Sequence, residues 1–332
     1  MTSSMNGTPS VETIEGDLPT QSDPPMRRRR KQKALHSADG RTAAILFGPT
    51  GLILLALVAV PIAFLLFASF TDFNQRSLFT GEFNIVGIEQ YMTVLADRDF
   101  WFSMLRTGLF TAGLVLGSVF IGMYVSQMMT RLNNGMRYLV TFVMIFAWAM
   151  PNVASSIVWK WLFQPGYGVL NWLLTKLVVF GDMTNTSWAN NTALALFCIW
   201  LLVVWQAVPY IAITLYAATL SVDHSCLEAA QLDGAGAWRT YWQILVPMIR
   251  PNLLVVTLLS VIWDFNVFNQ IWLVSQGGPS GSTSTIGVFT YTKAFVSFDI
   301  GQGSAISVIT VLVLLLLTGV YIRNLLKSGE DL

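Results

Sequence analysis

The chain has 332 residues, of which 54% are hydrophobic and only 11% are charged. A soluble globular domain carries roughly 25% charged residues, so this composition indicates that water is not the main solvent of the chain. The net charge of +1 argues against nucleic acid as a partner, because phosphate binding needs a clustered basic face.

Residues 1–41 are expected to form a disordered cytoplasmic tail. They are rich in Ser, Thr, Pro, Asp and Arg and have few large apolar side chains. Burial therefore cannot offset the entropy cost of ordering them. A basic run, Arg27 to Lys33, adjoins the first long apolar segment. Such a run is typical of a topology signal, and contact with anionic membrane lipid is the alternative.

The rest of the chain, residues 42–332, contains six apolar stretches, each long enough for the ~20 helical residues that cross about 30 Å of hydrocarbon. Two segments, Leu52–Leu66 and Val308–Val320, are apolar on every side, whereas buried helices of soluble proteins keep a polar face. The sequence therefore predicts an all-α integral membrane protein with six transmembrane helices. The stretches lie near residues 43–70, 103–129, 138–160, 193–220, 253–274 and 304–322.

Lysine and arginine set the predicted orientation, because they resist translocation. With the N-terminus inside, thirteen of the nineteen basic residues are cytoplasmic. This asymmetry predicts a multi-pass protein of the cell membrane with both termini cytoplasmic. The thirteen are Arg27, Arg28, Arg29, Arg30, Lys31, Lys33, Arg41, Arg131, Arg137, Arg239, Arg250, Arg323 and Lys327, and the other six are Arg76, Arg98, Arg106, Lys160, Lys176 and Lys293.

Prolines interrupt several predicted spans, at Pro49, Pro61, Pro151 and Pro209. Each proline removes a backbone donor and kinks or breaks its helix. Broken helices at mid-depth are tolerated where they are buried in protein or line a wet cavity, so Pro151 and Pro209 favour a nearby pathway. Simple kinks between packed helices are the alternative.

The predicted cytoplasmic loop 221–251 reads SVDHSCLEAAQLDGAGAWRTYWQILVPMIRP. Ser221, Asp223 or Ser225 can cap a first short helix, and Gly234 supplies the positive-φ residue that ends it. A second helix with three aromatic side chains stops at Pro247. The pattern predicts two short helices around a turn, with an amphipathic interfacial helix as the alternative.

The order Glu-Ala-Ala, then Asp-Gly, then Ile-x-x-Pro in this loop resembles the EAA loop of importer-type ABC permeases. In that family the loop docks into a cleft of an ATPase subunit, and the last two motif residues would fix the loop to the core. Val246 departs from the family pattern, in which leucine is common. The resemblance implies the importer-type ABC permease fold and a coupling surface formed by Glu228, Ala229, Ala230, Asp233, Gly234, Ile244 and Pro247.

The chain itself shows no site for ATP or for other chemistry. No lysine follows a glycine, so no segment resembles the GxxxxGK[ST] phosphate loop. The two cysteines lack CxxC spacing and the two histidines lie far apart, so a metal site has little support. A membrane-embedded enzyme would need a nucleophile–base pair or an HExxH-like cluster, and neither is present. We expect a non-catalytic subunit without a cofactor of its own, with ATP and Mg bound by partner ATPase subunits.

Two further segments, Trp159–Asn171 and Trp263–Pro279 with its Gly-Gly-Pro turn, resemble carbohydrate permeases of the maltose and glycerophosphate type. The match looks closest to the permeases of mycobacterial trehalose importers. The resemblance implies a disaccharide cargo, with trehalose favoured, and three kinds of partner: a second homologous permease, two ATPase subunits and an extracytoplasmic sugar-binding protein or lipoprotein. The alternatives are permeases for a glycerophosphodiester, an oligosaccharide or a peptide, and an ion-driven carrier with Asp264 as its proton site.

The fifth predicted span carries polar residues at membrane depth, where such groups are costly and face a cavity or a partner. Sugar hydroxyls need donors and acceptors, and the apolar face of a pyranose stacks on aromatic rings. Alignment of the Gly-Gly-Pro turn with the maltose-type permeases adds positions that line a sugar site, although Val267 replaces the amide of that pattern. The same comparison around residues 205–210 adds three positions of the fourth predicted span. The predicted pathway residues are Gln206, Ala207, Tyr210, Ser260, Trp263, Asp264, Asn266, Val267, Asn269 and Gln270.

Spacings of three, four and seven residues place Ser260, Trp263, Asp264 and Val267 on one face of the predicted fifth helix. The alternative role for the buried polar groups is contact between packed helices.

Overall fold

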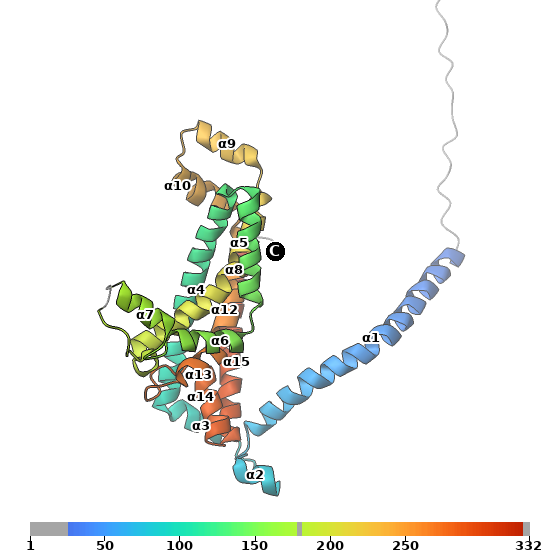
Figure 1. The fold of residues 1–332 in the computed structure, drawn as a ribbon. Coiled ribbons are helices and arrows are strands. Elements are labelled where there is room, and N and C mark those ends of the chain that lie inside the picture. The colour runs from blue at the N-terminus through green and yellow to red at the C-terminus, as the bar shows by residue number, and fades with distance from the viewer. Residues whose placement is uncertain (1–25, 178–180, 328–332) are drawn as a thin grey trace, which may run out of the picture. The chain divides into compact units, whose positions relative to one another are not determined.

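The structure is a computed structural model that describes residues 26–177 and 181–327. This part of the chain is helical, with two isolated β-bridges at Thr71–Ile85 and Asn74–Asp299. The chain divides into two compact units, one up to Pro61 and one from Ile62 onward. Figure 1 shows the ribbon with its helices labelled.

Helix α1, Met26–Ala68, runs through the described part of the first unit and ends in the second. Pro49 and Pro61 lie inside this helix without ending it. The predicted disordered tail falls outside the described residues over 1–25. From Met26 the structure is helical, which differs from the prediction, because Arg27–Asp39 contain neither proline nor glycine and are mostly good helix formers.

Within residues 26–177 and 181–327, four helices are long and apolar enough to cross a membrane: Phe47–Ala68 of α1, α4 (Arg98–Arg131), α8 (Thr192–Leu220) and Ile300–Arg323 of α15 (Ile300–Lys327). Two bent pairs raise the number to six if each pair forms one span. In the first, α5 (Asn134–Ala149) meets α6 (Asn152–Leu162) at 100°; in the second, Ala237–Met248 meets α12 (Arg250–Phe265) at 76°. The prediction that the chain is all-helical is confirmed, while the count of six spans stays a prediction.

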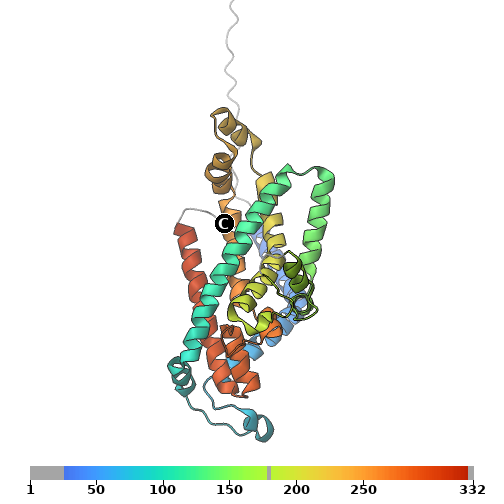
Figure 2. The same cartoon turned by 60° about the vertical axis from the view of Figure 1, so that its left-hand side comes forward.

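Four shorter helices lie at the two ends of the second unit. Helices α9 (His224–Leu232) and α10 (Ala237–Thr240) project at one end, and α2 (Gln75–Thr80) and α3 (Glu89–Ala96) lie at the opposite end (Figures 1 and 2). The remaining elements are α7 (Val169–Lys176), a 3₁₀ turn (Trp188–Asn190), a π turn (Tyr241–Leu245), α11 (Val246–Met248), α13 (Asn269–Ser275), α14 (Ile286–Tyr291) and a second π turn (Thr292–Val296).

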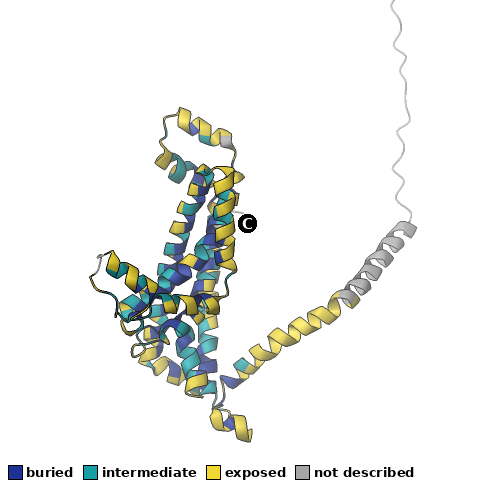
Figure 3. Cartoon of the chain, in the orientation of Figure 1, coloured by how far each residue is buried: buried dark blue, intermediate teal, exposed yellow. Residues whose placement is uncertain are grey.

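Close packing of α4 against α8 forms the centre of the second unit. Ser118, Gly122 and Ser126 are buried at intervals of four residues, which places them on one face of α4. Small residues let two helix backbones approach closely in a membrane protein. Ile211 of α8 packs so tightly here that a Cβ atom on Gly122 would lie 2.6 Å from its Cγ2 atom. Figure 3 shows the buried residues along the inner faces of these helices.

Two helices break where the sequence predicts single spans. The third predicted span breaks between Ala149 and Asn152, at Pro151, as that proline predicts. The prediction of a continuous fifth span over 253–274 is wrong, because α12 ends at Phe265 and α13 begins at Asn269. At this end the Asn266 Nδ2 atom donates to the Ile262 carbonyl at 2.9 Å, a local bond that competes with helix continuation. Pro209, by contrast, lies inside an unbroken α8.

We predict that Gly122→Ala lowers the free energy of unfolding by about 1–3 kcal/mol, because the added methyl group collides with buried Ile211. The measurement is unfolding by SDS in mixed micelles. Gly108→Ala in the same helix is the control, since no atom lies within 4 Å of its Cβ position. Equal stability of the two variants would show that the helices are not packed as described.

Candidate functional site

A cavity of about 460 Å³ lies between α8, α12 and the two helix breaks. This volume falls within the roughly 300–1,000 Å³ that is usual for small-molecule sites. All ten residues of the predicted pathway line it, so the structure brings the whole set together. Their role in binding stays a prediction. The other lining residues are Trp148, Asn152, Val203, Ile211, Ile262 and Phe268.

Both helix breaks contribute directly to the cavity wall. Asn152 is the first residue of α6 after Pro151, and residues 266–268 connect α12 to α13. Helices α6 and α13 also pack against each other. Irregular backbone at membrane depth is tolerated where it lines a cavity, and paired broken helices are typical of substrate sites in transporters.

A chain of side-chain amides joins the two breaks through α8. The Gln206 Nε2 atom donates to the Met150 carbonyl at 3.3 Å and to the Asn152 Oδ1 atom at 3.2 Å. The Gln270 Nε2 atom donates in turn to Gln206 Oε1 at 3.4 Å. Both glutamines are buried. Gln206 thus holds the α5–α6 break and the start of α13 at fixed positions around the cavity.

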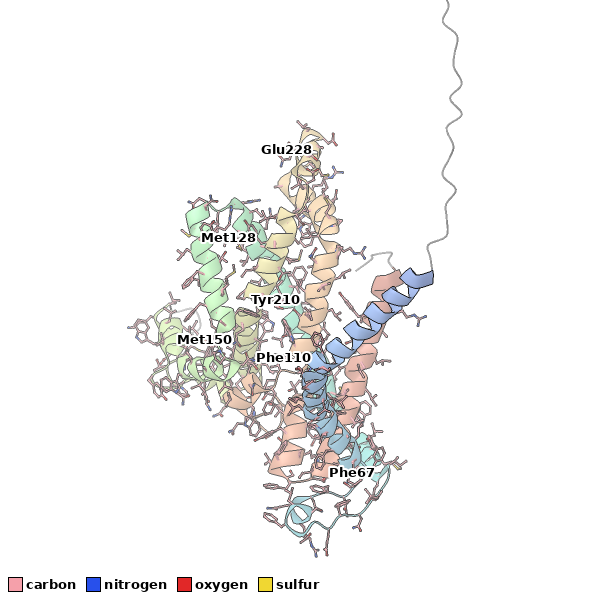
Figure 4. All side chains as sticks on the ribbon, turned by 90° about the vertical axis from the view of Figure 1, so that its right-hand side faces the viewer. Phe67, Phe110, Met128, Met150, Tyr210 and Glu228 are labelled. Atoms are coloured by element: carbon pink, nitrogen blue, oxygen red, sulfur yellow. The ribbon has the colours of Figure 1, made fainter. Side chains whose placement is uncertain are left out.

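Aromatic rings form another part of the wall. Trp148 stacks on Tyr210 with ring centroids 6.2 Å apart, and Tyr210 meets Trp263 edge to face at 5.3 Å. The Trp263 side chain is half-exposed, and Trp263 lines the cavity. Tyr210 lies midway along the bundle, between Glu228 and Phe67 at its two ends (Figure 4). The cavity therefore offers apolar ring faces together with amide donors and acceptors.

Asp264 supplies a carboxylate to this cavity. Its side chain is buried, and its Oδ2 atom has no hydrogen-bond partner among the residues that the structure describes. The Thr111 hydroxyl donates to the backbone carbonyl of Asp264 at 3.4 Å, which links α4 to α12. Ser260 lies one turn earlier and is also buried. The prediction that Val267 continues the same helical face is wrong, because α12 ends before it; Val267 reaches the cavity from the break.

The predicted coupling loop forms two short helices around a turn, as expected. Asp223 caps α9, its Oδ1 atom accepting from the Ser225 amide at 3.0 Å. Gly234 follows the helix with a φ of +83°, and the Ala235 amide donates back to the Ala230 carbonyl at 2.9 Å. Only glycine adopts this conformation without strain, which explains the residue at this turn.

The seven predicted coupling residues differ in exposure. Glu228, Ala229, Asp233, Gly234 and Pro247 are exposed, Ile244 is half-buried, and Ala230 is buried. Four of the exposed members lie on α9 and its following turn at the tip of the segment (Figure 1), whereas Pro247 lies in α11. Exposed residues on a projecting element can meet another chain, but the structure contains none, so docking stays a prediction.

The residues that anchor this segment were missed by sequence reasoning, which assigned the anchoring to Ile244 and Pro247. Leu245 and Ile249 are the deeply buried residues here, and they pack with Ile211 and Leu215 of α8. Their spacing of four residues places both on one face, which was the available signal. Helix α12 begins immediately after Ile249, so the anchored segment leads directly into the helix that carries Ser260 and Asp264. Trp148 of the cavity was also missed, because its contact with Tyr210 depends on the bend at Pro151.

Comparison with known proteins finds similarity over most of the chain. The family model described as "Binding-protein-dependent transport system inner membrane component" matches residues 118–328. The chain is 38% identical over 263 residues to the diacetylchitobiose uptake system permease protein DasB of Streptomyces coelicolor, covering 79% of this chain and 80% of that protein. It is 28% identical over 272 residues to the trehalose transport system permease protein SugA of Mycobacterium tuberculosis, covering 82% and 84%.

A solved structure shares the fold. It is the crystal structure of a bacterial ABC transporter involved in the import of the acidic polysaccharide alginate. The TM-score is 0.75 at 17% sequence identity, with 91% of this chain and 100% of that chain covered. This likeness confirms the fold predicted from the loop and the apolar stretches.

We predict that Gln206→Met lowers the free energy of unfolding by about 1–3 kcal/mol, because the buried Gln270 amide loses its acceptor. Unfolding by SDS in mixed micelles measures the change. The control is Gln243→Met, which alters an exposed glutamine on the loop segment. If Gln206→Met were no less stable than this control, the amide chain would not hold the two breaks.

Proposed function

Because the chain belongs to the family of binding-protein-dependent transport system inner membrane components, we propose that it forms the translocation pathway of an ATP-driven importer for a disaccharide, with trehalose favoured. The observation that carries this proposal is the cavity at two helix breaks, where three aromatic rings and an amide chain line the same space. Sugars have apolar faces that stack on rings and hydroxyl groups that need paired donors and acceptors. The names of the sugar-permease relatives support the same cargo class.

In this proposal the chain has six spans and both termini in the cytoplasm, so α9 and α10 face the compartment that contains ATP. The exposed residues of α9 and its turn dock on a separate ATPase, which binds the ATP and Mg. Burial of Leu245 and Ile249 in the bundle makes the segment a rigid extension of α12. Movement of the ATPase is thereby transmitted to the helix that carries Asp264, and this chain performs no catalysis itself.

The complete importer contains a second homologous permease, two ATPase subunits and an extracytoplasmic binding protein that delivers the sugar. The family's dependence on a binding protein supports the last of these partners. ATP binding closes the ATPase subunits and turns the permease pair outward, and release of the hydrolysis products returns it inward.

Reconstitution of the full complex in liposomes tests this function. Uptake of radiolabelled trehalose or diacetylchitobiose should require ATP and the binding protein and should persist when the proton gradient is dissipated. Uptake that collapses with the proton gradient but not with ATP depletion would instead identify an ion-driven carrier.

We predict that Glu228→Ala reduces sugar-stimulated ATP hydrolysis by the complex about tenfold or more, because an exposed charged contact with the ATPase is lost. The isolated ATPase subunit should keep its basal rate. Glu82→Ala is the matched control, since it removes an exposed carboxylate just after α2, a helix at the opposite end of the bundle from α9. Normal stimulation in Glu228→Ala would contradict the docking assignment.

The two native cysteines provide a direct test of docking. Cys226 lies exposed on α9, within one turn of Ala229 and Ala230, whereas Cys198 is buried in α8. We predict that a maleimide labels Cys226 in the chain alone and that assembly with the ATPase slows this labelling about tenfold or more. Cys198 should stay unlabelled until the protein is denatured. Labelling of Cys226 at the same rate in the assembled complex would place the ATPase elsewhere.

A further inference from the structure

The cavity has an uneven charge distribution. Asp264 is the one charged side chain among its sixteen described lining residues, and lysine, arginine and histidine are missing from that set. The remaining polar groups are amides and hydroxyls of residues such as Gln206, Asn269 and Ser260. The described wall therefore has one acidic group and no basic group.

Basic side chains elsewhere in the second unit are engaged away from this carboxylate. Arg106 donates to the Gly281 and Ser284 carbonyls. Lys293 pairs with Asp97 at 3.2 Å. Arg137 donates to the Met129 and Leu132 carbonyls near the end of α4. These bonds hold the three basic side chains in contact with other groups of the chain.

The Asp264 carboxylate is also left without a donor from the described part of the chain. Its Oδ2 atom is buried and unpaired, and the neighbouring Thr111 hydroxyl donates to the backbone carbonyl instead. A buried polar atom without a partner is costly, so a ligand that supplies a hydrogen bond gains an interaction there. A sugar hydroxyl is such a donor, whereas a carboxylate, sulfonate or phosphate group brings only acceptors and a like charge.

We propose that this cavity selects uncharged sugars over anionic ones and that Asp264 is the specificity-determining residue. Its Oδ2 atom accepts a hydrogen bond from a sugar hydroxyl. An anionic group beside it would meet a second acidic group and no basic side chain of the described wall, in a site of low dielectric constant where an unbalanced charge is costly. The inference rests on the proposed function and narrows its substrate class. The fold alone leaves the charge of the cargo open, since a similar fold serves the import of an acidic polysaccharide.

The test compares binding of a neutral disaccharide with binding of the same sugar after one primary hydroxymethyl group is oxidised to a carboxylate. The permease pair with its ATPase subunits is purified without the binding protein, so that only the membrane site selects. Trehalose, maltose and diacetylchitobiose are screened by equilibrium dialysis, and the tightest binder is paired with its own carboxylate. In the wild type the neutral sugar should bind about tenfold or more tightly than the carboxylate.

Two variants distinguish the effect of the acidic group of Asp264 from that of a simple hydrogen bond to the sugar. Asp264→Asn keeps the shape of the side chain and removes the acidic group, so the preference for the neutral sugar should fall to about threefold or less. Ser260→Ala, one turn away on the same helix, should weaken both sugars equally and leave their ratio unchanged.

Equal binding of both sugars in the wild type, or an unchanged ratio in Asp264→Asn, would overturn the inference while leaving a sugar importer in place. Failure of every neutral sugar both to bind and to be taken up in the reconstituted complex would overturn the proposed function, and the inference with it.

Discussion

The side-chain amide of Gln206 bonds to the break between α5 and α6 and to the start of α13, and these two segments shape the cavity of the second unit. In hydrocarbon a helix can break only if its freed backbone groups find other partners. Here the carbonyl of Met150, freed by the break at Pro151, accepts from Gln206, and the same side chain accepts from Gln270 beside the other break. One residue in the unbroken α8 thus bonds to a freed carbonyl at the first break and to a side chain beside the second, with the cavity between them.

The packing around α8 connects this cavity to the projecting α9–α10 segment. Small residues bring α4 against α8, and Leu245 and Ile249 bury the base of the segment against the same helix. Because α12 starts at the next residue, the 76° bend joins the loop to the cavity wall with no flexible linker between them. In the proposed function, this packed route through side chains and helical backbone carries a displacement at α9 to Ser260 and Asp264.

The long helices could be predicted from the sequence because hydrocarbon requires apolar side chains on every face, a requirement visible without tertiary contacts. The ten cavity residues were predictable from the alignment of the Gly-Gly-Pro turn, from the same comparison around residues 205–210, and from the cost of polar groups at membrane depth. The break at residues 266–268 was not, because a hydropathy pattern does not register the local bond from Asn266. The anchors Leu245 and Ile249 were missed because their burial depends on α8 packing against them, and Trp148 because it depends on a 100° bend.

The central claim is that sugar occupies this cavity while α9 engages an ATPase. The most direct measurement is a structure of the assembled importer with a disaccharide bound and a non-hydrolysable ATP analogue present. We predict sugar density between Trp263 and the amides of Gln206 and Gln270, a hydroxyl within hydrogen-bond distance of Asp264, and α9 seated in the ATPase. Sugar density outside the cavity, or α9 exposed to solvent in the assembled complex, would contradict the account.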